Sequence, residues 1–305
     1  MKIIYAGSGE FGLPTLNALR DAKHQIVLVI SQPDRPAGRG RHLSPTPIAQ
    51  FAIEQKLELL RTADINKEKL PEADLLVVVA FGQKISSDLV TRARLGSINL
   101  HGSRLPKFRG ASPVNAAILA GETITGNSVI RLATKMDAGS ILGQSEITIG
   151  ELETAGELHD RLAIDGAILI LEVIEKLSRG ETTASPQRES NATYAVKMTR
   201  DAARIDWTKS ADQIARQIRG MFPWPGCHVK LLDETGAERA RIELVRAKPT
   251  KETGPPGTIL PTGAVATGTG AIEIVELQPQ GKRPMSLIAF KNGHQWSAGM
   301  RLESI

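Results

Sequence analysis

The sequence predicts an α/β protein in which a mainly parallel sheet, covered by helices on both faces, is followed by a smaller β-barrel. Three observations predict this. Strand-like and helix-like segments alternate through residues 1–177. The run LLVVVAF at residues 75–81 is apolar throughout, as in a strand that is buried on both faces. Beyond residue 228, short strand-like segments are separated by turns, which is typical of a small barrel or sandwich.

The first half of the chain supplies the sheet and its helices. We expect strands at residues 2–5, 25–30, 75–81, 97–100 and 128–134. We expect helices at residues 14–21, 114–120 and 157–177. Ser112 and Pro113 suit the N-cap and the first position of the middle helix. This β-α alternation indicates parallel strands with helices on both sides.

The pattern changes after Arg179. Residues 180–206 are polar and contain no long apolar run, so they suggest a linker. Residues 210–221 resemble a short helix, and the barrel strands follow it. We therefore expect a catalytic domain at residues 1–188, a linker at 189–206 and the barrel domain at 207–305.

Composition favours a cytoplasmic protein without membrane contact. The single cysteine, Cys227, excludes an intrachain disulfide, which suits a reducing compartment. The N-terminal MKIIYAG runs into a strand without a separate apolar segment or cleavage site. The longest uncharged stretch, residues 253–272, is rich in Gly, Pro and Thr and does not resemble a membrane span.

The net charge of +5 is unevenly distributed. Residues 1–175 carry 19 Lys and Arg against 20 Asp and Glu, so the positive excess lies beyond them. Two interpretations remain open on charge alone. The excess is a solvated basic surface, or it contacts a polyanion.

Gly7, Gly9 and Gly12 form a G-x-G-x-x-G pattern after the first strand, a fingerprint of dinucleotide binding. A dinucleotide site also needs an acid at the end of the second strand. Asp34 has nearly the right spacing, but it follows Pro33 inside the basic run DRPAGRGRH. The pattern alone is weak, so we favour a plain strand-to-helix turn over a dehydrogenase.

Asn99, His101 and Asp137 are the candidate catalytic residues because each stands at or just beyond the end of a predicted strand. The carboxyl ends of parallel strands line the crevice where such sheets bind ligands. An amide donates to a developing oxyanion, an imidazole moves a proton near pH 7, and a carboxylate orients that imidazole. Taken singly, a turn cap, a loop histidine and a turn acid explain them better, whereas three strand-end positions taken together favour catalysis. No nucleophile is evident, and the histidines lack metal-ligand spacing, so we expect no metal.

The motifs N-x-H, G-S-x-L-P-x-x-R-G and M-D-x-G together resemble the folate-dependent formyltransferase family. The segments SQPDRPAGRGRHLSPTPI, KMTRDAARIDW and FPWPG are similar to the branch that acts on the methionyl group of initiator tRNA. The resemblance runs from Ala6 to beyond Pro279. It implies a Rossmann-like domain that binds 10-formyltetrahydrofolate and an OB-like barrel that helps to hold tRNA.

The resemblance also assigns roles to residues. It makes Asn99, His101 and Asp137 catalytic. It gives a folate-contacting segment consisting of Ser103, Arg104, Leu105 and Pro106. Contact with the acceptor end of the tRNA falls to Arg39, and the neighbouring basic residues Arg35, Arg41, Lys107 and Arg109 are expected to add contacts to tRNA.

Three positions depart from the family pattern. Arg104 replaces a leucine, so either an apolar contact to folate is missing or this side chain turns outward. Ser140 stands where an aspartate is common, and Gly7-Ser8-Gly9 replaces G-T-P. None of these removes a proposed catalytic group.

The resemblance therefore implies formyl transfer from 10-formyltetrahydrofolate to initiator Met-tRNA by a monomer. A second hypothesis keeps the chemistry but uses a small amine acceptor, such as an amino sugar or glycinamide ribonucleotide. A third is a non-catalytic RNA- or folate-binding protein. The basic loop at residues 34–42 and the basic second half favour the tRNA acceptor.

Overall fold

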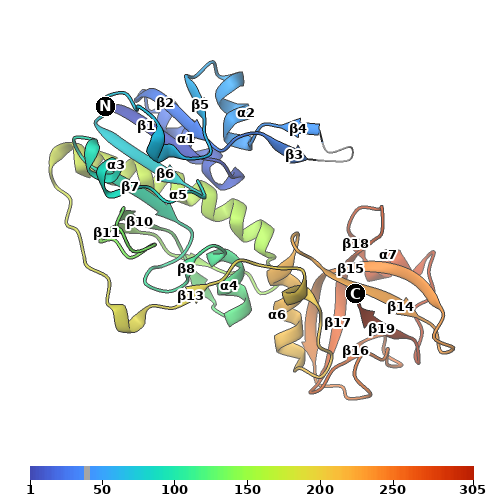
Figure 1. Ribbon diagram of the computed structural model, residues 1–305. Coiled ribbons are helices and arrows are strands. Elements are labelled where there is room, and N and C mark those ends of the chain that lie inside the picture. Colours follow the sequence, from blue (N-terminus) through green and yellow to red (C-terminus); the bar gives the residue numbers. More distant parts are fainter. Residues whose placement is uncertain (38–41) are drawn as a thin grey trace. The chain divides into compact units, whose positions relative to one another are not determined.

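A computed structural model describes residues 1–37 and 42–305. They form two compact units (Figure 1). Unit 1 comprises Met1–Pro113, Ile124–Ile147 and His159–Ala195, and unit 2 comprises Val114–Thr123, Thr148–Leu158 and Val196–Ile305. The predicted fold class is confirmed, because unit 1 holds a mainly parallel sheet with helices and unit 2 holds a barrel-like antiparallel sheet. The catalytic domain, linker and barrel domain expected at residues 1–188, 189–206 and 207–305 stay a prediction.

The sheet of unit 1 has the strand order β11-β10-β7-β6-β1-β2-β5. Five neighbouring strands are parallel, and β10 and β11 pair antiparallel at one edge. All of β6 is buried, as its apolar run predicts. The strands are β1 (Lys2–Gly7), β2 (Gln25–Ser31), β5 (Leu59–Arg61), β6 (Leu75–Val79), β7 (Ser97–His101), β10 (Ser128–Arg131) and β11 (Ile141–Gln144).

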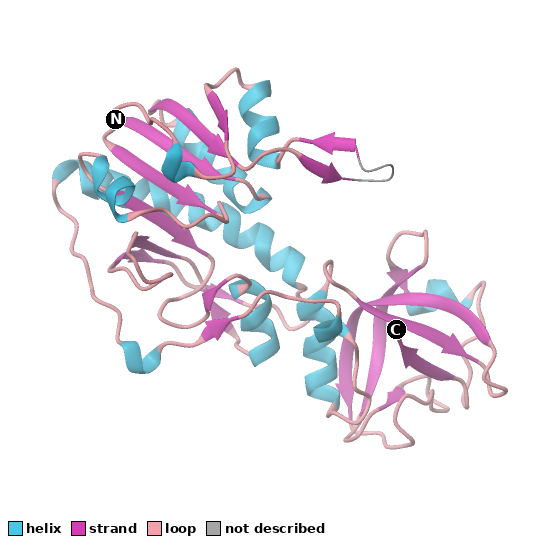
Figure 2. Cartoon of the chain, in the orientation of Figure 1, coloured by secondary structure: helices cyan, strands magenta, loops and turns pink. Residues whose placement is uncertain are grey.

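Several short helices and one long helix accompany this sheet. Thr46 caps α2 by accepting from the Ala49 N–H, and Pro47 occupies the first turn. Helix α5 passes behind the strands in the view of Figure 2. Its Gly166 lies so close to β7 that a Cβ there would stand 2.6 Å from Leu100 Cδ2. The helices up to this point are α1 (Leu13–Asp21), α2 (Pro47–Glu54), α3 (Ser87–Arg92), α4 (Pro113–Ala120) and α5 (Ala155–Arg179).

Three small ladders complete the first part of the chain. The hairpin of β3 (Arg35–Ala37) and β4 (His42–Ser44) follows β2. Strands β9 (Ile124–Thr125) and β12 (Ile147–Thr148) pair with each other. Strand β8 (Arg109–Gly110) pairs in parallel with β13 (Tyr194–Ala195), so part of the predicted linker belongs to a ladder.

The glycine pattern at the start of the chain accommodates Tyr5. This side chain is fully buried, and its hydroxyl donates to the Gly12 carbonyl at 2.8 Å. A Cβ at Gly7 would lie 2.8 Å from the Tyr5 ring, and one at Gly12 would overlap the hydroxyl. Asp34 is paired with Arg61 at 2.8 Å. Gly7 and Gly12 therefore make room for an aromatic side chain, which supports a plain turn over a dinucleotide site.

Unit 2 contains the sheet β16-β17-β15-β14-β19, with β18 paired to β17. Helix α6 (Ala211–Met221) begins with a capping box between Ser210 and Gln213. Its apolar side packs on the core of the barrel, which includes the buried Cys227. The remaining elements are β14 (Cys227–Leu232), β15 (Glu238–Thr250), β16 (Val265–Ala266), β17 (Ala271–Pro279), β18 (Met285–Ser286), α7 (Leu287–Lys291) and β19 (Arg301–Ser304).

An ion-pair network fixes β15 to the start of α5 within unit 2. Arg246 lies 2.7 Å from both Glu157 Oε1 and Glu276 Oε2. The Arg246 guanidinium lowers the pKa of Glu157 to about 2. Among the described residues, no helix combines the length and apolarity needed to cross a membrane.

Candidate active site

Strand β7 positions two of the predicted catalytic residues. It lies between β6 and β10, and Asn99 pairs with Val78 on one side and Ile130 on the other. His101 lies two residues further on, so both side chains stand on the same face at the carboxyl end of the strand. Asn99 is half-buried, and within residues 1–37 and 42–305 its side-chain amide has no hydrogen-bond partner. Its N–H groups are therefore free to meet a ligand.

The His101 imidazole is buried, with a hydrogen bond at one ring nitrogen and a carboxylate near the other. Nε2 lies 2.9 Å from the Phe108 carbonyl oxygen, which only accepts, so Nε2 carries the proton. Nδ1 lies 3.7 Å from Asp137 Oδ2. This distance suits an ion pair once Nδ1 is protonated. The structure thus brings these two residues together from positions far apart in the sequence.

Asp137 follows β10 in a backbone conformation that few non-glycine residues adopt, with φ at +53°. Its Oδ2 accepts a hydrogen bond from the Gly110 N–H at 2.9 Å. Gln187 donates to the Asp137 and Gly139 carbonyls at 2.7 and 2.8 Å, which holds the turn. One carboxylate oxygen therefore accepts a hydrogen bond from the backbone of β8 and also faces the imidazole.

The predicted folate segment is tightly organised. The hydroxyl of Ser103 donates to the Lys107 carbonyl at 2.6 Å. Ser128 donates to the Ser103 carbonyl and accepts from the Leu105 N–H. Leu105 is buried and precedes Pro106 through a cis peptide bond. Their folate contact stays a prediction.

A ladder with β13 supports the loop between β7 and α4. Thr193 accepts from the Phe108 N–H through its hydroxyl and from the Arg109 N–H through its carbonyl, both at 2.9 Å. The Ala195 carbonyl accepts from the Ala111 N–H at 2.9 Å. The backbone that contacts His101 and Asp137 is thus fixed by a segment that the sequence marks only as polar.

Arg109 is not a surface cation. Its side chain is 1% exposed. Nε and Nη2 donate to Gln187 Oε1, and Nη1 donates to the Glu189 carboxylate at 3.0 Å. The predicted tRNA contact of Arg109 is therefore corrected. This guanidinium ties β8 to the segment that holds Asp137.

The other predicted basic residues lie elsewhere. Arg104 turns outward and pairs with Glu146 at 2.6 Å, which agrees with one of the two poses expected for it. Arg35 and Lys107 are exposed. Arg39 and Arg41 lie outside the described residues.

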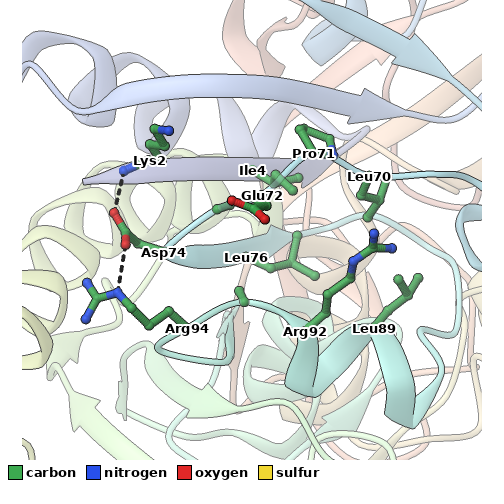
Figure 3. A pocket seen from close by; sticks show the side chains of 12 residues that line it. Lys2, Ile4, Leu70, Pro71, Glu72, Asp74, Leu76, Leu89, Arg92 and Arg94 are labelled. Atoms are coloured by element: carbon green, nitrogen blue, oxygen red, sulfur yellow. Dashed lines mark hydrogen bonds and ion pairs between the residues drawn. The ribbon is translucent and has the colours of Figure 1, made fainter.

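A cavity of unit 1 lies away from these residues. It has a volume of about 470 Å³ and is lined by Lys2, Asp74 and Arg94, among others (Figure 3). Asp74 accepts there from the Lys2 backbone N–H and from Arg94. Lys2 and Asp74 stand at the amino ends of β1 and β6, whereas Asn99 and His101 stand at the carboxyl end of β7. The cavity is therefore not the candidate active site.

Comparison with known proteins places this geometry in a family. The formyl transferase profile matches residues 1–174, and the profile of the formyl transferase C-terminal domain matches residues 197–295. The methionyl-tRNA formyltransferase of Methylococcus capsulatus is 41% identical over 99% of both chains. The chain belongs to the methionyl-tRNA formyltransferase family. The resemblance inferred from the motifs is thereby confirmed.

A second relative supports membership of the methionyl-tRNA formyltransferase family, and two solved structures share the fold. The enzyme of that name from Methylobacillus flagellatus is 39% identical over 100% of both chains. An N-formyltransferase from Helicobacter canadensis, solved with folinic acid and dTDP-3-aminofucose, is 16% identical. It has a TM-score of 0.66 and covers 89% of this chain and 97% of its own. HypX from Aquifex aeolicus, solved with tetrahydrofolic acid, has a TM-score of 0.61 at 18% identity and covers 95% of this chain and 46% of its own. At such identities the two structures show the shared fold.

Sequence reasoning missed the backbone groups and the positioning residues of this family member. The Phe108 carbonyl and the Gly110 N–H lie inside the motif that carried the resemblance, but no side-chain pattern reveals a backbone contact. Gln187 and Thr193 lie in a polar stretch without periodicity. Only their proximity in the folded chain identifies them.

Proposed function

We propose that this protein transfers the formyl group of 10-formyltetrahydrofolate to the α-amino group of initiator methionyl-tRNA, which gives N-formylmethionyl-tRNA. Full-length similarity to methionyl-tRNA formyltransferases supports the proposal. The observation that carries it is the convergence of Asn99, His101 and Asp137 at the carboxyl edge of one sheet. Binding of folates by structural neighbours is consistent with the donor.

Formyl transfer requires a hydrogen-bond donor to the developing oxyanion and a group that carries a proton. The amine of the acceptor attacks the formyl carbon, and negative charge develops on the formyl oxygen. The unpartnered amide of Asn99 is placed to donate to that oxygen. His101 keeps one proton on Nε2, bound to the Phe108 carbonyl, so Nδ1 is the atom that accepts the proton lost by the attacking amine as the amine bonds to the formyl carbon. The oxyanion then collapses, and the bond between the formyl carbon and the folate nitrogen breaks. Asp137 faces Nδ1 and stabilises the imidazolium until the proton passes to the departing nitrogen of the folate.

The test is formyl transfer by the Asn99→Ala variant. Loss of one oxyanion donor costs roughly 3 kcal/mol, so we expect turnover to fall about a hundredfold. Folate affinity should remain nearly unchanged because the amide acts on the transition state. Asn17→Ala is the matched control, since Asn17 is a half-buried asparagine on α1. Near-normal turnover by Asn99→Ala would remove this residue from the mechanism.

The acceptor is tested by mixing the enzyme with 10-formyltetrahydrofolate and Met-tRNA. Formation of formyl-methionine supports the proposal. Formylation of an amino sugar or glycinamide ribonucleotide alone would support the small-amine hypothesis, and no turnover with any acceptor would favour a binding protein.

We propose that tRNA phosphates meet Arg35 and Lys107, which are exposed, and also Arg39 and Arg41. Phosphate contacts predict that tRNA affinity falls steeply with salt. Arg35→Ala should therefore weaken tRNA use more than folate binding, and equal damage to both would oppose this role. We also propose that the protein acts in the cytoplasm as a monomer, which sedimentation of the purified chain would test.

A further inference from the structure

Two large apolar side chains stand exposed beside the catalytic loop. Tyr194 is 63% exposed and Met136 is 71% exposed, whereas the large apolar residues of the core are buried. Each is close in the chain or in a strand pair to a residue of the Asp137–Gly110 hydrogen bond. Met136 directly precedes Asp137, and Tyr194 pairs with Arg109, the neighbour of the Gly110 that donates to Asp137. The Asp137–Gly110 hydrogen bond thus links the two segments that carry Met136 and Tyr194.

The backbone beneath Tyr194 is rigid. The carbonyls of Thr193 and Ala195, on either side of it, both accept hydrogen bonds from the β8 segment. Ala195 is buried, and successive side chains of a strand point to opposite sides, so the Tyr194 ring faces solvent. A ring held in this way loses little conformational freedom when a ligand stacks on it.

The exposed ring suits a planar ligand. Lys135, which directly precedes Met136, forms an ion pair with Glu189. An exposed tyrosine ring offers an apolar face of the kind on which nucleic-acid bases stack in other proteins.

The covalent structure of an aminoacyl-tRNA places its terminal base close to the reacting amine. In an aminoacyl-tRNA the amino acid is esterified to the ribose of the terminal adenosine. When its amine reaches His101 and Asp137, the adenine is therefore only one sugar away. We propose that Tyr194 forms a stacking subsite for that terminal adenine. The inference rests on the proposed function, because it requires an aminoacyl-tRNA acceptor.

Steady-state kinetics with both substrates tests the subsite. Tyr194→Ala should raise the KM for Met-tRNA by roughly 5- to 150-fold, the range expected for loss of one stacked base. The KM for 10-formyltetrahydrofolate should stay within about twofold. Tyr194→Phe keeps the ring and should behave as the unchanged protein does. Ile168→Ala, a change at another exposed apolar side chain of unit 1, is the control.

A direct readout uses an acceptor-stem RNA whose terminal adenine is replaced by fluorescent 2-aminopurine. Binding should quench the fluorescence with the unchanged protein and with Tyr194→Phe, but not with Tyr194→Ala at saturating protein. Undiminished quenching with Tyr194→Ala would overturn the proposal. So would an equal rise of both KM values, which would assign the ring to the folate or to the shape of the loop. If quenching depends on Tyr194 while the unchanged protein makes no formyl-methionine, the proposed function fails and the subsite remains.

Discussion

Replacement of Arg109 by methionine should destabilise the protein and slow formyl transfer together. Methionine keeps the apolar stem but removes every donor of a side chain that is 1% exposed. The bonds from Nε and Nη2 to Gln187 Oε1, at 3.1 and 2.9 Å, are lost. A hydrogen bond from a charged donor contributes about 1.5–3 kcal/mol, so we expect the free energy of unfolding to fall by about 2–3 kcal/mol. Glu189 adds little, because its exposed carboxylate is readily solvated.

The effect should also reach the active site. Gln187 holds the turn of Asp137, so a loosened Gln187 shifts the carboxylate that faces His101 and lowers kcat. Urea unfolding and single-turnover formyl transfer measure the two effects. Arg109→Lys, which keeps the charge but not the fork of donors, should be intermediate. Unchanged stability, with weaker tRNA binding and a salt slope reduced by about one, would show a phosphate contact instead and refute the reasoning.

Three further predictions concern packing, pH and thiol chemistry. Gly12→Ala should cost about 1–3 kcal/mol of unfolding free energy, because its Cβ overlaps the Tyr5 hydroxyl. Adding Tyr5→Phe should recover most of this in urea unfolding, and additive losses would contradict the packing explanation. Glu157→Gln should cost up to about 1 kcal/mol at pH 7, because Arg246 lowers the pKa of this half-exposed carboxyl to about 2. A lowered folded-state pKa stabilises above the unfolded value of about 4.5, so the two proteins should converge in stability as the pH falls from 4.5 to 2, and a constant difference would exclude the ion pair as the cause. Burial raises the pKa of Cys227 to about 12, so iodoacetamide at pH 8 should label it in denaturant only, as mass spectrometry would show.

The sequence was most informative where a pattern is local. The unbroken apolar run predicted β6 closely, and Pro113, expected at the first position of its helix, begins α4, because burial and helix starts depend on neighbouring residues. The strand predicted at residues 128–134 ends at Arg131 as β10, since strand length depends on its partners β7 and β11. A ladder as short as β13 is too brief for any alternation to be visible.

Long-range partners explain where prediction of the site failed. Charge and position marked Arg109 as a phosphate ligand, but its partners Gln187 and Glu189 come 78 and 80 residues later. Likewise, the glycine pattern predicts only a turn, whereas in the folded chain a Cβ at Gly7 or Gly12 would collide with the Tyr5 side chain. Residue type predicts which chemistry is possible, and only the folded chain decides whether a group is already engaged.

The β8–β13 ladder has a consequence for how this chain can be divided. A fragment that stops at residue 188 would retain Asn99, His101 and Asp137. It would lack Thr193, whose hydroxyl and carbonyl anchor the polypeptide beneath the imidazole. Gene fusions or domain exchanges that reuse the segment with these residues must therefore extend through Ala195. A shorter segment would contain the reactive groups without the strand pairing that positions the loop around them.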